Sequence, residues 1–167
     1  LISLSAFIYA NYISGDNQSW ELVVNSMLLS VPLFILYFNI GLLLLVRQQH
    51  LLGAIDKKLG KLVYFVPRVV SLVIIGFITL FSFDVFEPGG NILEMLFAFV
   101  MHSIPSIILG IGLFFAWKKS VVGYYLFLVA GLFFALIVLR NTLQSLGVLL
   151  LFSGPLLSIS GLFWADW

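Results

Sequence analysis

The sequence predicts an all-α protein, a polytopic bundle of transmembrane helices. Of its 167 residues, 62% are apolar and 9% are charged, and the mean hydropathy is +1.19. A soluble domain is about half apolar and about a quarter charged, so this chain has too little polar surface to coat a water-soluble particle. The apolar residues also form runs of about 20, the length of helix that crosses a hydrocarbon core about 30 Å thick.

Short polar breaks divide the chain into six predicted spans, of which the first is incomplete. The spans cover residues 1–14, 21–46, 66–86, 94–117, 121–139 and 144–165. Because the breaks are short, neighbouring spans are expected to pair as three antiparallel hairpins. The chain begins with Leu1 rather than Met, and we expect further residues before it. This division predicts an N-terminal hairpin (1–46), a cytoplasmic amphipathic connector (47–65) and a four-helix unit (66–167).

The distribution of charge predicts the orientation. Seven of the eight Lys and Arg residues, all except Arg140, fall on one side of these six spans. Cytoplasmic loops are enriched in Lys and Arg, so both chain ends are expected in the cytoplasm.

The connector is expected to form an amphipathic helix on the membrane surface. Its apolar residues recur at helical spacing, while Lys57, Lys58 and Lys61 occupy the other face. A basic face of this kind binds anionic lipid headgroups at the cytoplasmic surface. The alternative is a docking face for a partner protein. Pro67 is expected in the first turn of the next helix, where its missing N–H leaves no hydrogen bond unmade.

Three predicted spans carry a Ser-x-Pro sequence near the bilayer midplane. The residues are Ser30 and Pro32, Ser103 and Pro105, and Ser153 and Pro155. An internal proline frees the carbonyl four residues earlier, so three kinked helices could gather carbonyls and hydroxyls around one transport site. The alternative is a set of kinks whose carbonyls are satisfied by neighbouring groups.

His102 is the one ionisable residue placed well inside a predicted span. Such residues are candidate proton relays or ligands of a metal or haem. The alternative is a neutral imidazole hydrogen-bonded to a serine or a backbone carbonyl. The other histidine, His50, falls in the connector, so a haem with two histidine ligands from this chain is not expected. We predict no metal and no cofactor.

Acidic residues gather at the end of the predicted four-helix unit that lies opposite the cytoplasmic side. They are Asp84, Glu87 and Glu94. Three neighbouring acids could collect cations at the mouth of a pathway. Acids at this position also commonly mark the interface with water.

No catalytic motif is found. The chain has no nucleophile elbow, phosphate-binding loop or HExxH zinc motif, and without cysteine it has no thiol chemistry. A net charge of +1 leaves no basic excess for nucleic acid. We therefore expect neither an enzyme nor a nucleic-acid-binding protein.

One residue and three short segments resemble a known family. They are Arg68, the sequence Leu80-Phe81-Ser82-Phe83-Asp84-Val85-Phe86, the sequence Met101-His102-Ser103-Ile104-Pro105, and Ala116-Trp117. Over residues 66–165 the chain is similar to small four-span bacterial membrane proteins known only as a domain of unknown function. The resemblance implies a bacterial inner-membrane location and a four-helix unit, and it carries no assigned activity.

The function expected from the sequence is that of a non-catalytic accessory or anchoring subunit. Short loops and helix faces rich in aromatic and small residues suit packing against lipid and other membrane protein chains. The alternative is a small-solute, ion or proton transporter or channel, with its site at His102 and the kinked helices. A subunit predicts a closed, dry bundle, whereas a transporter predicts a cavity that water can enter.

Overall fold

The computed structural model describes residues 19–53, 56–86, 91–141 and 146–167, which are helical with short connections. Its elements are α2 (Ser19–Leu51), α3 (Lys57–Phe81), the short 3-10 helix η1 (Ser82–Val85), α4 (Ile92–Ala116), α5 (Ser120–Asn141) and α6 (Leu146–Asp166). The all-helical prediction is confirmed. Five of these helices are long and apolar enough to span a membrane. The predicted first span, residues 1–14, lies outside the described residues.

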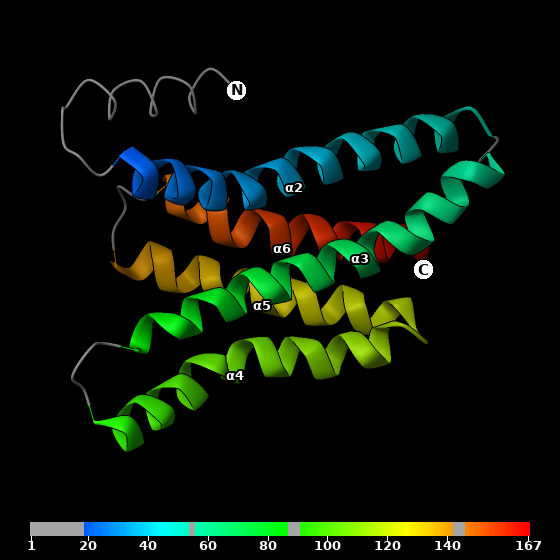
Figure 1. Ribbon diagram of the computed structural model, residues 1–167. Coiled ribbons are helices and arrows are strands. Elements are labelled where there is room, and N and C mark those ends of the chain that lie inside the picture. The colour runs from blue at the N-terminus through cyan, green and yellow to red at the C-terminus, as the bar shows by residue number, and fades with distance from the viewer. Residues whose placement is uncertain (1–18, 54–55, 87–90, 142–145) are drawn as a thin grey trace.

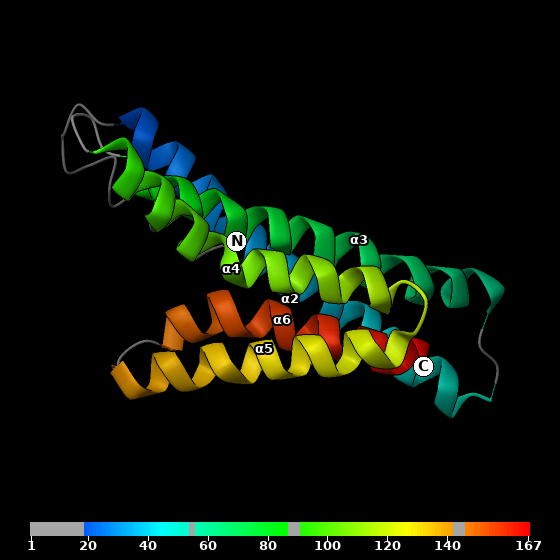
Figure 2. The ribbon, with the colours of Figure 1, turned by 90° about the horizontal axis from the view of Figure 1, so that it is seen from below.

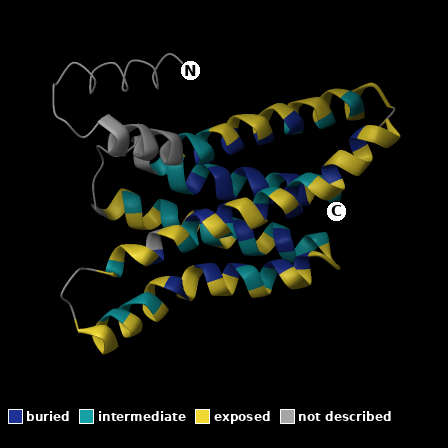
Figure 3. Cartoon of the chain, viewed as in Figure 1, coloured by how far each residue is buried: buried dark blue, intermediate teal, exposed yellow. Residues whose placement is uncertain are grey.

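Successive long helices run in opposite directions along the molecule (Figure 1). We call the end that holds η1 and the start of α4 the η1 end, and the end that holds the α4–α5 connection the Lys118 end. α6 is the most buried span and packs against α2, α3 and α5. α4 packs only against α3, η1 and α5 among the described elements. Burial accordingly concentrates along α6, and much of α2 and α4 is exposed (Figure 3).

α3 differs from its predicted form because it begins ten residues before Pro67. The segment predicted as a separate surface helix contributes the end of α2 and the first turns of α3. The prediction that Pro67 lies in a first helical turn is therefore wrong. Ser71, one turn further on, donates a hydrogen bond of 2.5 Å to the Pro67 carbonyl. Because Pro67 has no N–H, the carbonyl that loses its helical hydrogen bond is that of Val63, four residues earlier, and membrane helices tolerate internal prolines of this kind.

The core is apolar and centred on α6. One cluster of buried side chains joins all five long helices; its fully or nearly buried members are Ile35, Ile74, Leu109, Leu113, Ala116, Phe127, Leu156, Ile159 and Phe163. The rings of Phe127 and Phe163 are stacked, with centroids 5.8 Å apart. A second cluster, toward the Lys118 end, contains Leu42, Leu59, Val63 and Leu162.

The helices do not stay equally close along their length. α4 lies near α5 at the Lys118 end, and α3 and α4 diverge from α5 and α6 toward the η1 end (Figure 2). Near the Lys118 end, Leu126 of α5 lies against Gly112 of α4, where a methyl group would collide with it. This divergence decides which faces of α4 and α5 are covered by the chain itself.

Candidate functional site

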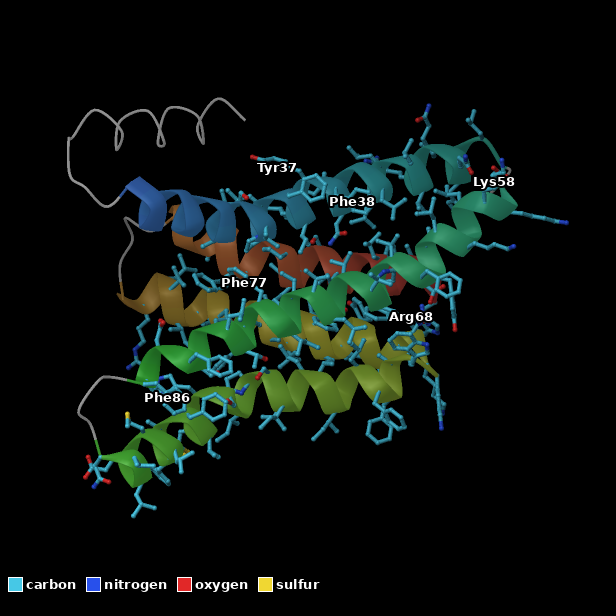
Figure 4. The ribbon with its side chains drawn as sticks, in the orientation of Figure 1. Tyr37, Phe38, Lys58, Arg68, Phe77 and Phe86 are labelled. Carbon is cyan, nitrogen blue, oxygen red and sulfur yellow. The ribbon has the colours of Figure 1, made fainter. Side chains whose placement is uncertain are left out.

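A buried ion pair lies at the Lys118 end of the bundle. Arg68 of α3 is 1% exposed (Figure 4), and its Nη1 donates to Oδ2 of Asp166, the last residue of α6, at 2.9 Å. Its Nη2 donates to Oγ of Ser120, the first residue of α5, at 3.0 Å. The Ser120 hydroxyl also donates to Asp166 Oδ2. We call Arg68, Ser120 and Asp166 the Arg68 cluster; it connects three helices.

Aromatic and backbone groups complete the surroundings of the guanidinium. Nη1 donates to the Tyr64 carbonyl, one turn earlier in α3. The guanidinium carbon lies 3.7 Å from the centroid of the Tyr64 ring and 5.6 Å from that of Phe163. Cations are attracted to ring faces most strongly where water is excluded. The buried Nε–H of Arg68 has no partner among the described residues.

The Arg68 cluster stabilises helix packing but has no catalytic arrangement. Its carboxylate is neutralised by Arg68 and its hydroxyl is hydrogen-bonded, so neither is poised as a base or nucleophile. Breaking a buried ion pair by removing one partner is strongly destabilising, because the other charge stays buried. This pair was not predicted, although opposite charges at the same end of two spans were a usable signal.

Serine and asparagine side chains join α6 to its neighbours. Asn39 of α2, fully buried, donates from Nδ2 to Ser158 Oγ at 2.9 Å, and Ser158 donates to the Pro155 carbonyl at 2.7 Å. Toward α5, Ser153 Oγ donates to the Gly131 carbonyl at 2.6 Å. Ser160 Oγ likewise donates to the Tyr124 carbonyl at 2.9 Å. These polar groups of α6 are used to hold helices together.

The Asn39–Ser158 bond can be tested by a double-mutant cycle. Asn39→Ala and Ser158→Ala are each expected to lower the free energy of unfolding, by loss of this bond and of buried volume. The coupling between them is expected to be about 0.6–1.7 kcal/mol, the range for hydrogen bonds between membrane helices. Thermal unfolding in detergent measures all four proteins of the cycle. Fully additive single effects would show that the bond contributes no stability.

His102 is exposed on α4 rather than enclosed in the bundle. Its Nδ1 lies 2.9 Å from the Ala98 carbonyl, one turn earlier. Ser103 is buried, and its hydroxyl donates to the Phe99 carbonyl at 2.8 Å. Pro105 is exposed. The predicted site residues on α4 are therefore oriented in different directions.

The other predicted midplane residues lie on helices that α4 does not contact. Pro32 of α2 and Pro155 of α6 are fully buried, Ser30 is half-buried, and Ser153 is bonded to α5. The structure therefore brings residues of α2 and α6 together but not with His102. A narrow cleft forms here, with the lining residues Pro32, Ile74, Phe77, Ile78, Phe134, Leu151, Phe152 and Leu156. All of these side chains are apolar.

Charged residues predicted at the two surfaces are exposed. Asp84 of η1 and Glu94 in the first turn of α4 face outward, and Glu87 lies outside the described residues. Glu94 Oε1 accepts a hydrogen bond of 3.3 Å from Asn91 Nδ2, while Asn91 Oδ1 caps the helix through the Leu93 N–H. This arrangement favours the start of α4. At the other end, Lys57, Lys58 and Lys61 are exposed on the first turns of α3.

A protein-family model described as a domain of unknown function, DUF7670, matches residues 56–167, two thirds of the chain. The chain belongs to the DUF7670 family. The predicted resemblance to a domain of unknown function is confirmed, and the match begins ten residues earlier than expected. No curated protein and no solved structure matches the chain. The DUF7670 segment starts at Asp56, directly before α3, and contains the whole Arg68 cluster and His102.

Proposed function

We propose that this DUF7670 protein is a non-catalytic subunit that packs within, or anchors, a larger membrane complex. The observation that carries the proposal is that buried polar groups form an ion pair and hydrogen bonds between helices of this chain. The Arg68 cluster and the serines of α6 bind neighbouring helices of the same chain. The cleft between α2, α3, α5 and α6 is apolar, as expected for a closed bundle rather than a polar pathway.

The outer surface supports the same proposal. Large apolar side chains are exposed along every long helix, among them Tyr37, Leu72, Phe97, Phe133 and Leu150. Within a bilayer such faces contact lipid or other helices at no hydrophobic cost. We place the protein in a bacterial inner membrane with both ends cytoplasmic. In this orientation Lys57, Lys58 and Lys61 contact anionic headgroups, which attract basic residues at the inner leaflet.

Purification from native membranes in mild detergent tests the proposal. Mass spectrometry of the purified material is expected to find other membrane chains in fixed stoichiometry with this one. Recovery of a homogeneous protein without partner chains would overturn the subunit proposal and favour the transporter. In that case flux into liposomes that is abolished by His102→Ala, with unchanged folded yield, would identify the transporter directly.

A further inference from the structure

His102 lies on a face of α4 that other helices of the chain cover near the Lys118 end. The same face is open nearer the η1 end. Leu109 and Leu113 follow it by seven and eleven residues, which places both within about 20° of it around the helix axis. Both leucines are buried, at 3% and 2% exposure, whereas His102 is exposed. The difference arises because α5 leaves α4 toward the η1 end (Figure 2).

The uncovered region continues on α5. Leu126 contacts α4 at Gly112, and Phe133, Ile137 and Arg140 follow it by seven, eleven and fourteen residues. These spacings keep them on about the same side of α5, and all three are exposed. We call the exposed His102, Phe133, Ile137 and Arg140, together with the half-buried Met95 and Ala98, the open α4–α5 surface. Toward the η1 end, this surface continues the contact that α4 and α5 make with each other near the Lys118 end.

The hydrogen bond at Nδ1 determines what His102 offers to a ligand. A carbonyl oxygen can only accept, so Nδ1 carries the proton in the contact with Ala98. In the neutral imidazole, Nε2 then has a free lone pair, and no described residue donates to it. His102 is the eleventh residue of α4, about 15 Å from the start of the helix. An acceptor at this depth is surrounded by hydrocarbon, where a donor from a neighbouring membrane helix satisfies it.

We infer that one transmembrane helix of a partner subunit lies between α4 and α5 on this open surface. A hydroxyl or amide side chain of that helix donates to His102 Nε2, as in other contacts between membrane helices. The small Ala98, one turn from His102, lets the helix approach closely. A second copy joined through paired His102 residues is disfavoured, because two Nε2 acceptors face each other without a proton between them.

Arg140 adds a second requirement on the partner. It lies in the last turn of α5, at the η1 end, and forms no ion pair with any described residue. An acidic residue of the partner helix would complement it at the membrane interface. His102 precedes Gly112 by ten residues and Arg140 follows Leu126 by fourteen. Because Gly112 and Leu126 meet, the two side chains differ in depth by about four residues of helix, roughly 6 Å. The partner helix therefore carries a donor and, about four residues away, Asp or Glu.

Photo-crosslinking in native membranes tests this inference, which rests on the proposed function. A photoreactive amino acid is placed at Ala98 or Phe133, and at exposed Tyr37 on α2 as the matched control. We expect the first two positions, and not Tyr37, to yield a crosslinked apolar segment with the donor and acid at this spacing. Crosslinks at Ala98 and Phe133 to lipid alone would overturn the inference.

Two substitutions separate the hydrogen bond from the shape of the surface. His102→Leu is expected to weaken association with the partner about 3- to 18-fold, the range for one hydrogen bond between membrane helices. Ala98→Phe is expected to abolish association by filling the approach to His102. Gly41→Phe on α2, at an exposed position where an added Cβ meets nothing within 4 Å, is the control and is expected to leave association unchanged.

The outcomes distinguish this inference from the proposed function. Partner chains that purify with Ala98→Phe and His102→Leu as well as with the unaltered protein would overturn the docking inference and leave the subunit proposal intact. Absence of partner chains from the unaltered protein would overturn both. Loss of association with either variant, with a normal folded yield by size-exclusion chromatography, would support the inference.

Discussion

Arg68→Met is expected to lower the free energy of unfolding by about 3–5 kcal/mol, because it leaves the Asp166 carboxylate nearly buried without its cation. The same change removes the hydrogen bonds to Ser120 and the Tyr64 carbonyl. For a domain of this size the loss corresponds to a fall in melting temperature of roughly 6–20 °C. Thermal unfolding of the purified protein in detergent, followed by circular dichroism, measures it.

Two further variants identify the cause. In the double variant Arg68→Met with Asp166→Leu, most of the lost stability is expected to return, because buried ion pairs are often replaceable by apolar residues of similar volume. Arg47→Met, at an exposed arginine near the end of α2, is expected to stay within about 0.5 kcal/mol of the unaltered protein. A double variant as unstable as Arg68→Met would show that lost packing, and not an unpaired charge, causes the effect.

Gly123→Ala is expected to lower the free energy of unfolding by about 1–3 kcal/mol through overpacking. A Cβ at Gly123 would lie 2.7–2.8 Å from three ring carbons of Phe163. That ring cannot move freely, since Phe163 is fully buried and stacked on Phe127. The same thermal unfolding measurement detects the loss.

Gly76→Ala in α3 is the matched control for this substitution. A Cβ there meets nothing within 4 Å, and alanine favours the helical conformation by up to about 1 kcal/mol over glycine. Stability is therefore expected to be unchanged or slightly raised. Equal losses at Gly76 and Gly123 would contradict the assignment of close α5–α6 packing to Gly123.

The helices were largely predictable because length and hydropathy are properties of each segment alone. The predicted span 94–117 corresponds closely to α4 (Ile92–Ala116), and 121–139 lies within α5 (Ser120–Asn141). The start of α3 was not predictable from the same signals. Pro67 suggested a helix start and the basic residues before it suggested a surface helix. Continuation of the helix through Pro67 depends on tertiary surroundings, including the contacts of Arg68 with Asp166 and Ser120.

The candidate site was less predictable, because it depends on which helices meet. His102 stood out in the sequence as an ionisable residue inside a predicted span, and it lies within α4. Depth along a span says nothing about direction around the helix axis, so the outward orientation of His102 could not be derived. The pairing of Asn39 with Ser158 requires α2 beside α6, two helices that lie far apart in the sequence.

The separation of Arg68 from its partner has a consequence for biosynthesis. Asp166 follows Arg68 by 98 residues, so at about 5–20 residues per second the ribosome completes the pair roughly 5–20 s after Arg68 is made. During that interval α3 carries an arginine without its carboxylate partner, and from the Lys118 end of the bundle its long side chain extends toward the membrane interface. α3 consequently gains its ion pair with α6 only after α4 and α5 have been made, so its packing against α6 is completed later than its packing against α4.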